Sequence, residues 1–342
     1  MKFAYTADWH LSGYTQDKIV NGLPERLYEK KVVQENIANY CRLNEIKTIV
    51  IGGDLLHNKS IIYSLAQSIL LDFFREYKDL NFIVIDGNHD LSGKGSDVVS
   101  ALKSLDNEPN VRRVSKPTRI TDDSGLDILI VPYSDNMIDA IKKSSAKYLI
   151  SHFGLNEGTL NSGVSIISDI GLKDLVGKYQ YVLLGHYHKP QEITKDNISV
   201  YYSGSITQND WGEKGEEKRF LIVDTDTDTI ESVPTKGYKK YFDLQITEEN
   251  KTEVIKKARE LKEEGHNVKI TRKEAVDIDD INKEFMVVDK VEKDITNRGL
   301  SSTMSMRDKL MRYLEVNEIP EDKRDIYLQE ALDIVNSVAE RK

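Results

Sequence analysis

Apolar residues in the first two-thirds of the chain fall in short runs. The core of each run is three or four residues long and partly β-branched or aromatic, and most runs have Gly, Asp, Asn or Ser close by, which is typical of buried strands. The runs are Phe3–Thr6, Thr48–Ile51, Phe82–Ile85, Ile128–Val131, Tyr148–Ile150, Tyr181–Leu184, Val200–Tyr202 and Phe220–Val223.

Two longer stretches separate the first three runs, Leu27–Asn44 and Ser60–Tyr77, and both carry apolar residues at helical spacing. Strand-like runs that alternate with helix-like stretches predict a βαβαβ start and therefore an α/β sheet. The apolar stripe of the second stretch consists of Ile61, Leu65, Ile69, Leu70 and Phe73.

The pattern changes near Pro234–Gly237. A run that alternates as a half-exposed strand, a helix-like stretch and a run at Val268–Thr271 follow, which predicts a small βαβ unit. After the polar stretch Lys290–Ser302 come two short amphipathic helices split by Ile319-Pro320. The second carries a stripe of Leu328, Ala331, Leu332, Val335 and Val338. We therefore expect three parts, with boundaries at 1–235, 236–290 and 291–342.

Composition excludes an integral membrane protein. Charged residues make up 31% of the 342 residues, and no apolar run approaches the ~18 residues that span a bilayer. The single cysteine, Cys41, cannot form an internal disulfide, which fits a reducing compartment, so we expect a cytoplasmic protein. The net charge of −9 gives nucleic-acid binding no support, although a basic groove can coexist with an acidic remainder.

Six of the seven histidines follow apolar runs, in company with Asp, Asn or Gly. The carboxyl ends of neighbouring strands in an α/β sheet converge on one crevice. The sequence therefore predicts that five segments bring acids, an amide and imidazoles to one rim. They are Ala7-Asp8-Trp9-His10, Gly52-Gly53-Asp54-Leu55-Leu56-His57, Gly87-Asn88-His89-Asp90, Ser151-His152-Phe153 and Gly185-His186-Tyr187-His188.

This set of side chains suits two divalent cations. Carboxylate, amide oxygen and imidazole without thiolate favour Mn, Fe, Zn or Mg. Asp8 and His10 stand at i and i+2, so on extended chain both would point to one side. One carboxylate can hold two cations about 3.5–4 Å apart, and an imidazole free of metal can protonate a leaving oxygen. Any one segment alone could be a turn, a cap or an exposed imidazole pair, but all five together favour a metal centre.

In this order, the five segments resemble the calcineurin-like metallophosphoesterase superfamily over about residues 1–224. Asp8-Trp9-His10-Leu11 with Gly53–His57, and Gly185–Gln191 followed by Tyr202-Ser203-Gly204-Ser205, are most similar to SbcD-type nuclease subunits. The resemblance implies an α/β fold, a two-sheet sandwich flanked by helices, with a small α+β capping domain and a C-terminal helical pair.

The resemblance also implies roles for individual residues. One metal would be held by Asp8, His10, Asp54 and His188, and the other by Asp54, Asn88, His152 and His186, with manganese as the implied metal. His89 would act on the leaving group, and Asp90 would orient it. His57 matches a family histidine near the site whose role stays open.

The implied partners are DNA, a coiled-coil ATPase of the SbcC type and a second copy of the chain. The C-terminal helices would dock on the ATPase, unless they pack on their own core. Candidate DNA contacts, each of which could instead be an ordinary solvated charge, are Lys94, Arg112, Arg113, Lys239 and Lys240. The polar loop Gly13–Arg26 matches no family feature.

Three functions are open at this point. The first is a metal-dependent DNA nuclease subunit that works with an SbcC-type ATPase in DNA end processing, repair or recombination. The second is a phosphodiesterase or phosphatase that acts on a non-DNA substrate, which the acidic net charge mildly favours. The third is an inactive structural subunit, which the intact ligand set disfavours.

Overall fold

The computed structural model describes residues 1–339, except 94, 124, 162–167, 273–275, 277–280, 282, 290–305 and 318. The chain divides into two compact units. The first contains Met1–Asp243 with Arg259–Val268, and the second contains Leu244–Ala258 with Lys269–Lys342. This division passes through the small α+β part, so the boundaries 1–235, 236–290 and 291–342 stay predictions.

The first unit is built on two six-stranded sheets. In the first sheet β1, β4, β5 and β8 run parallel to one another. On the other side of β1, β15 pairs antiparallel with β1, and β16 pairs antiparallel with β15. In spatial order the strands are β16 (Thr229–Pro234), β15 (Arg219–Asp224), β1 (Lys2–Thr6), β4 (Thr48–Ile51), β5 (Asn81–Ile85) and β8 (Val111–Val114).

The second sheet has four parallel strands with an antiparallel strand at each edge. In spatial order its strands are β13 (Gln191–Lys195), β14 (Ile198–Tyr202), β12 (Tyr181–Gly185), β11 (Tyr148–His152), β10 (Asp127–Val131) and β9 (Thr118–Thr121).

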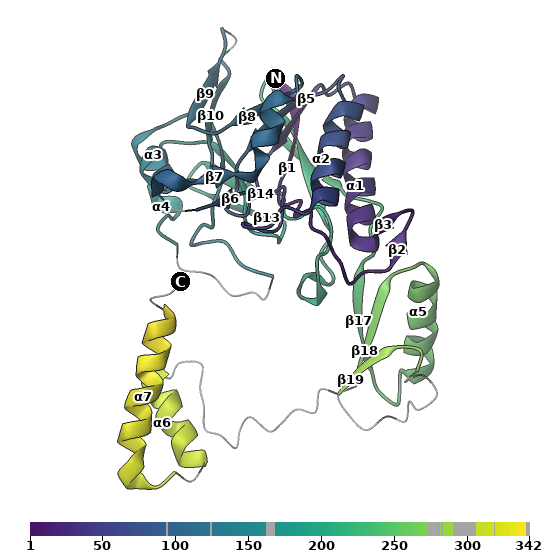
Figure 1. Cartoon of the computed structure of the whole chain (residues 1–342), viewed down its shortest axis with the longest axis vertical. Helices are drawn as coiled ribbons and strands as arrows, with labels where there is room; N and C mark the ends of the chain where they lie inside the picture. The colour runs from purple at the N-terminus through teal and green to yellow at the C-terminus, as the bar shows by residue number, and fades with distance from the viewer. Residues whose placement is uncertain are drawn as a thin grey trace. The chain divides into compact units, whose positions relative to one another are not determined.

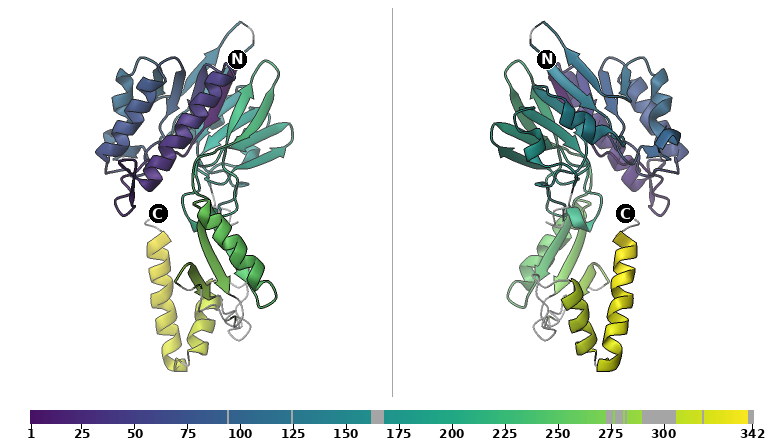
Figure 2. Two further views of the ribbon diagram at one scale, coloured as in Figure 1. Left: turned by 90° about the vertical axis from the view of Figure 1, so that its right-hand side faces the viewer. Right: turned by 90° about the vertical axis from the view of Figure 1, so that its left-hand side faces the viewer.

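Helices cover the outer faces of the two sheets, as Figure 1 and Figure 2 show. The first sheet carries α1 (Glu25–Leu43) and α2 (Ser64–Glu76), and the second carries α3 (Met137–Lys143) and the short α4 (Leu172–Leu175). The two-residue period of a strand sorts side chains between the layers. In β1, Phe3 and Tyr5 lie in the core between the sheets, whereas Ala4 faces the helices. The predicted sandwich flanked by helices is confirmed.

Short elements fill the loops of this unit. They are the hairpin strands β2 (Ile19–Val20) and β3 (Leu23–Pro24), the pair β6 (Leu91–Ser92) and β7 (Val99–Ser100), and the 3-10 helices Gly95–Asp97, Ala101–Asn107 and Trp211–Glu213. The β2–β3 hairpin occupies the loop Gly13–Arg26.

A third sheet of three strands forms the small α+β part, with one helix between its first two strands. It contains β17 (Tyr241–Ile246), α5 (Lys251–Glu263), β18 (Asn267–Arg272) and β19 (Met286–Asp289). The C-terminal helical pair, α6 (Met306–Val316) and α7 (Glu321–Ala339), follows, and its two helices contact each other. Both additions agree with the predicted fold class.

The sequence pattern missed strands and misplaced part of one stripe. The edge strands β8, β9, β13 and β16 carry many charged or hydroxyl side chains, which conceal their strand character. Helix α2 begins at Ser64, so Ile61 lies before it and is exposed. In α7, Leu328 is buried rather than available to a partner. Among the described residues, no helix combines the length and apolar composition needed to cross a bilayer.

The layer between the sheets gives the first testable prediction. Leu183 in β12 is fully buried there, so Leu183→Ala should lower the free energy of unfolding by about 2–5 kcal/mol, through lost burial and a residual cavity. Denaturant titration measures the change. Leu43 at the end of α1 is 85% exposed, and Leu43→Ala should change stability by less than about 0.5 kcal/mol. Equal effects would contradict the assigned layer.

Candidate metal centre

The site lies where parallel strands of both sheets end. The loops after β1 and β4 stay tied together beyond the sheet, since Asp8 N donates to Gly53 O (3.0 Å) and His10 N to Asp54 O (2.9 Å). Leu11 N donates to Leu55 O (2.8 Å), and His57 N donates to Leu11 O (3.0 Å). This ladder holds the first two histidine segments in fixed register.

Asp8 and His10 reach the same point, but not on extended backbone as the sequence interpretation assumed. Both have left-handed conformations, with φ of 55° and 48°. Between them, the Trp9 ring turns into the core against Phe73, with ring centroids 5.5 Å apart. Left-handed residues other than glycine cost free energy and are held in place by their surroundings, here by the ladder and the Trp9 anchor.

Asp54 also has a left-handed conformation, and glycines leave room for its carboxylate. A Cβ on Gly87 would lie 2.2 Å from Asp54 Oδ1, and a Cβ on Gly53 would lie 2.6 Å from His152 Nδ1. Side chains at these two positions would therefore collide with the site. The Gly-Gly-Asp and Gly-Asn-His sequences are explained by this close approach rather than by turn formation alone.

The first group of side chains contains Asp8, His10 and His188 with Asp54 beside them. His10 Nε2 lies 2.9 Å from His188 Nε2, 3.6 Å from Asp54 Oδ2 and 3.8 Å from Asp8 Oδ1. Ligand atoms of Asp8, His10 and His188 all lie within 4.8 Å of one another. Two imidazole nitrogens and two carboxylates thus converge on one small volume.

The second group shares Asp54. His152 Nδ1 donates to Gly52 O (2.7 Å), which turns its Nε2 toward Asp54 Oδ2 (3.2 Å) and Asn88 Oδ1 (3.1 Å). His186 Nδ1 lies 3.0 Å from the same amide oxygen. A carbonyl on Nδ1 fixes the tautomer that leaves Nε2 free to bind a cation, a usual arrangement for metal-binding histidines.

The protonation states suit cation binding. Burial lowers the pKa of His186 to about 4, and burial together with His188 lowers that of His10, so both imidazoles are neutral at pH 7. Burial opposes charge on His152, but the Asp54 carboxylate outweighs it and raises the His152 pKa to about 9. The proton on His152 Nε2 lies between His152 and Asp54. A metal ion bound there would displace this proton, because imidazole binds metal in its neutral form.

Two residues beside the proposed ligand His188, Glu213 and Lys218, were missed by sequence reasoning. His188 Nδ1 donates to Glu213 Oε1 (2.9 Å), and the buried Lys218 ammonium lies 2.8 Å from Glu213 Oε2 and donates to His188 O (2.8 Å). Although burial opposes its charge, the contacts with His188 and Lys218 hold the Glu213 pKa well below its usual range. Glu213 follows no predicted strand and no histidine, so the sequence carried no local signal for it.

His89 and Asp90 contact different groups. His89 Nδ1 donates to His57 O (2.5 Å), while Asp90 is fully buried and accepts from the backbone amides of Gly87 (2.9 Å) and Leu56 (2.9 Å). The carbonyl of His57 thus contacts the His89 ring nitrogen, and the orienting role of Asp90 stays a prediction. Asp90 holds the two loops together. The His57 ring is largely exposed, with Nδ1 3.4 Å from His10 Nδ1.

The candidate DNA contacts are scattered. Lys94 lies outside the described residues. The Arg113 guanidinium is held by Asp86 (2.9 Å) and Asp106 (2.7 Å), which leaves it poorly suited to bind phosphate. Lys239 pairs with Glu25 (2.6 Å). Arg112 is exposed on β8, and Lys240 is half-buried.

A two-sheet sandwich whose parallel strands end in acids, an amide and imidazoles defines a metallophosphoesterase, and the chain belongs to the calcineurin-like phosphoesterase family, which matches residues 1–190. The SbcD component of the SbcCD nuclease from Staphylococcus epidermidis is 23% identical over 305 aligned residues, which cover 78% of this chain and 77% of that protein.

Two solved structures are also similar in fold. An archaeal phosphodiesterase is 16% identical with a TM-score of 0.38, and covers 68% of this chain and 99% of its own. A dimetal phosphatase from Danio rerio is 10% identical with a TM-score of 0.47, and covers 69% of this chain and 96% of its own.

The family implies divalent cations, and the side chains present fit them. Carboxylate and amide oxygens with neutral imidazole nitrogens are hard-to-intermediate ligands. The Nε2 atoms of His10 and His188 face each other at 2.9 Å. Two nitrogen lone pairs this close repel each other unless they share a proton or bind a cation. The fit therefore holds for divalent metals in general.

Glu213 gives a prediction for this site. Glu213→Gln keeps the size of the side chain but removes the charge that holds His188, so the affinity for divalent metal should fall about 10–100-fold. Calorimetric titration with Mn²⁺ measures it. The control Glu216→Gln removes another carboxylate that contacts Lys218 but no histidine, and should change the affinity little. Equal losses in both variants would show that Glu213 acts only through Lys218.

Proposed function

We propose that this chain is the nuclease subunit of an SbcD-type complex, which hydrolyses DNA backbone phosphodiesters with two metal ions. The observation that carries the proposal is the position of the Asp54 carboxylate, one oxygen of which lies within 3.6 Å of His10 Nε2 and 3.2 Å of His152 Nε2. One carboxylate thus borders both groups of ligands, as a two-metal site requires. The named relative, a nuclease component of S. epidermidis, supports DNA as the substrate.

In this proposal Asp54 would be shared between two metal ions, with manganese as the metal. Asp8, His10 and His188 would hold the first ion, and Asn88, His152 and His186 would hold the second. Bound divalent cations lower the pKa of a water molecule and neutralise charge on the phosphoryl group. The protein's own contribution is to orient these ligands through the Gly52 carbonyl and the Glu213 carboxylate.

His89 supplies the proton for the leaving sugar oxygen. Its Nδ1 proton is held by His57 O, so the proton that it gives away is the one on Nε2 of the imidazolium form, which leaves the neutral ring protonated on Nδ1. The backbone amide of His89 donates to Asp54 Oδ1 (2.8 Å), which fixes the distance between the imidazole and the shared carboxylate. Such a general acid contributes typically 10²–10⁴-fold to rate.

The C-terminal helices are the proposed contact with an SbcC-type ATPase, in a cytoplasmic complex for DNA repair or recombination that contains two copies of this chain. Large apolar and aromatic side chains remain exposed on them, which supports a docking role. They are Tyr313 (58% exposed), Val316 (41%), Ile326 (59%) and Tyr327 (42%).

A phosphodiesterase of non-DNA substrates is the second candidate, and the net charge of −9 favours it mildly. The inactive structural role is disfavoured by the geometry. The proposed ligands Asp8, His10 and His188 lie close together, and acceptors on Nδ1 set the tautomers of His152 and His188, which supports an active site.

The proton role of His89 can be tested by changing the leaving group. His89→Gln should lower kcat on a DNA oligonucleotide about 100-fold or more, because the sugar oxygen leaves poorly without a proton. On bis-p-nitrophenyl phosphate the loss should be below about tenfold, since nitrophenolate needs no general acid. His266→Gln, outside the rim, is the control. An equal loss on both substrates would point to metal binding rather than proton transfer.

The docking role can be tested on the exposed face of α7. The double substitution Ile326→Ser and Tyr327→Ser should leave hydrolysis of bis-p-nitrophenyl phosphate unchanged but abolish ATP-stimulated DNA cleavage with the SbcC-type ATPase of the same genome. Co-sedimentation would show the loss of the complex directly. The matched control, Ile19→Ser with Val20→Ser on the β2–β3 hairpin, should still bind the ATPase. If the double variant still formed the complex, the interface with the ATPase would not include this face of α7.

A further inference from the structure

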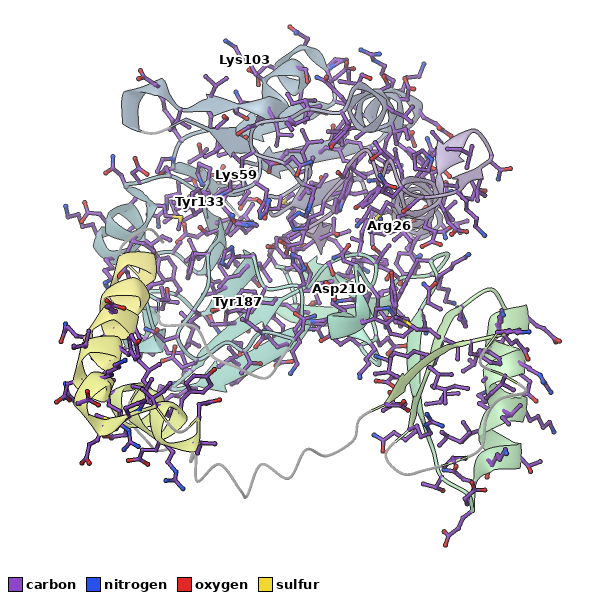
Figure 3. All side chains as sticks on the ribbon, turned by 60° about the horizontal axis from the view of Figure 1, so that its bottom comes forward. Arg26, Lys59, Lys103, Tyr133, Tyr187 and Asp210 are labelled. Atoms are coloured by element: carbon purple, nitrogen blue, oxygen red, sulfur yellow. The ribbon has the colours of Figure 1, made fainter. Side chains whose placement is uncertain are left out.

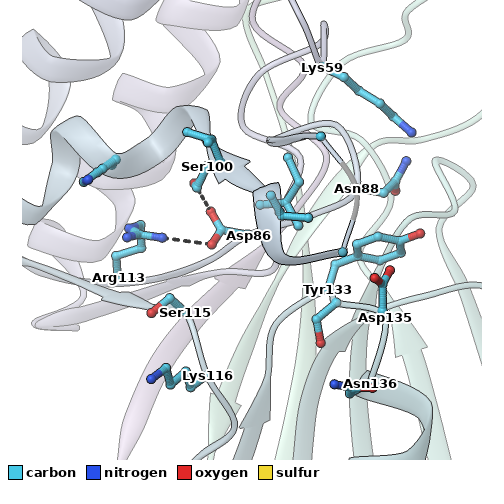
Figure 4. A pocket seen from close by; sticks show the side chains of 17 residues that line it. Lys59, Asp86, Asn88, Ser100, Arg113, Ser115, Lys116, Tyr133, Asp135 and Asn136 are labelled. Carbon is cyan, nitrogen blue, oxygen red and sulfur yellow. Dashed lines mark hydrogen bonds and ion pairs between the residues drawn. The ribbon is translucent and has the colours of Figure 1, made fainter.

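A pocket of about 670 Å³ opens beside the metal centre. Asn88, a proposed metal ligand, forms part of its wall, so the pocket begins where one group of ligands ends. Lys59 comes from the loop after β4 of the first sheet, and Tyr133 comes from the loop after β10 of the second (Figure 4). Figure 3 shows both side chains on the first unit of the chain.

The charge of this pocket is opposite to that of the whole chain. Arg113 is paired with Asp86 and also with Asp106, which lies outside the lining, so this group adds no positive charge to the pocket. The remaining charged side chains of the lining are three lysines (Lys59, Lys103 and Lys116) and one acid (Asp135). A locally positive pocket on a protein of net charge −9 concentrates anions at that place.

Two of these lysines are not used by the fold. Within the described residues, neither Lys59 nor Lys116 makes an ion pair or a side-chain hydrogen bond, and both are exposed. They stand on different loops, one after β4 and one between β8 and β9. Cations on separate loops around one pocket fit an extended polyanion better than a single phosphate group.

Tyr133 adds an aromatic face between these cations. Its backbone amide donates to Asp86 O (2.9 Å), and its half-buried ring packs at the edge of the core of the second sheet. The core of the second sheet packs against one part of the ring, and the ring lines the pocket together with Asn88 (Figure 4). A fixed aromatic ring in a basic pocket is the usual platform for an unstacked base of a single strand.

We propose that this pocket binds the single-stranded nucleotides that flank the scissile phosphate, with a base against Tyr133 and backbone phosphates at Lys59 and Lys116. The inference rests on the proposed function and adds to it the strand form of the substrate. A phosphodiester has a nucleoside on each side of the reacting phosphate, and this pocket accommodates one of those sides. Duplex DNA must fray there before a base can reach the ring.

The test measures binding without cleavage. A short fluorescent oligothymidylate is titrated with the full chain in calcium instead of manganese, and fluorescence anisotropy gives Kd over a range of salt concentrations. Lys59→Gln with Lys116→Gln should weaken binding about tenfold or more. It should also lower the slope of log Kd against log salt by about 1.4, which is about 0.7 for each lost phosphate contact on a single strand.

Tyr133→Leu should weaken binding about fivefold to a hundredfold, and Tyr133→Phe should keep wild-type binding because the ring remains. The control is Lys78→Gln, an exposed lysine in the turn between α2 and β5, at the opposite end of the strands. The lysine variants change exposed side chains, so they test the pocket even where Tyr133→Leu disturbs the core.

Wild-type binding in the lysine double variant, an equal loss in Lys78→Gln, or no binding of the oligonucleotide by the wild-type chain would each overturn the inference. Hydrolysis of bis-p-nitrophenyl phosphate with manganese is measured in parallel and tests the proposed chemistry separately. A chain that binds the strand as expected but hydrolyses nothing would retain the pocket and refute the nuclease.

Discussion

Two buried carboxylates at the ends of adjacent parallel strands are the constraint on which this structure depends. Asp8 and Asp54 are at most 2% exposed, and two like charges out of water would destabilise the fold without compensation. The compensation comes from the chain itself: Asp8 accepts from the His186 amide, and Asp54 accepts from the His89 amide. The other oxygen of Asp54 faces the imidazoles of His10 and His152, so the fold itself places a negative charge where a cation could bind.

That constraint explains why both sheets end at one rim. His186 follows β12 of the second sheet, yet its backbone amide binds a carboxylate that follows β1 of the first. A shift of either sheet by one residue would move a whole face of side chains and separate these groups. The apolar layer between the sheets and the metal centre therefore specify the same register. Stability and chemistry are coupled through this shared geometry.

The sequence predicted the sandwich and the histidine segments that meet at its rim because six of the seven histidines follow a recognisable apolar run. It could not predict contacts between residues that are distant in the sequence, or the backbone conformations that depend on such contacts. The left-handed backbone at Asp8 and His10 follows from the ladder to the β4 loop, which no local pattern reports. The resemblance assigned Asp90 to the His89 imidazole, whereas in the structure its carboxylate accepts from the backbone amides of Gly87 and Leu56. Glu213 lies in a short 3-10 helix without a histidine, so only the fold brings it to His188.

The net charge of the chain is also a poor guide to what one part of its surface can bind, because it carries no information about where the charges lie. A total of −9 sums side chains over the whole surface, whereas a polyanion responds to the potential within about 10 Å, the screening length at ~0.1 M salt. The buried acids Asp8 and Asp54 lie among the candidate metal ligands, and a bound cation would reverse the sign of the charge that they present to a phosphate. Lys59 and Lys116 line one pocket with Asn88, so positive charge is concentrated there while the rest of the surface is acidic. In the proposed function, such a distribution would favour one path for a nucleic-acid strand over binding across the whole surface.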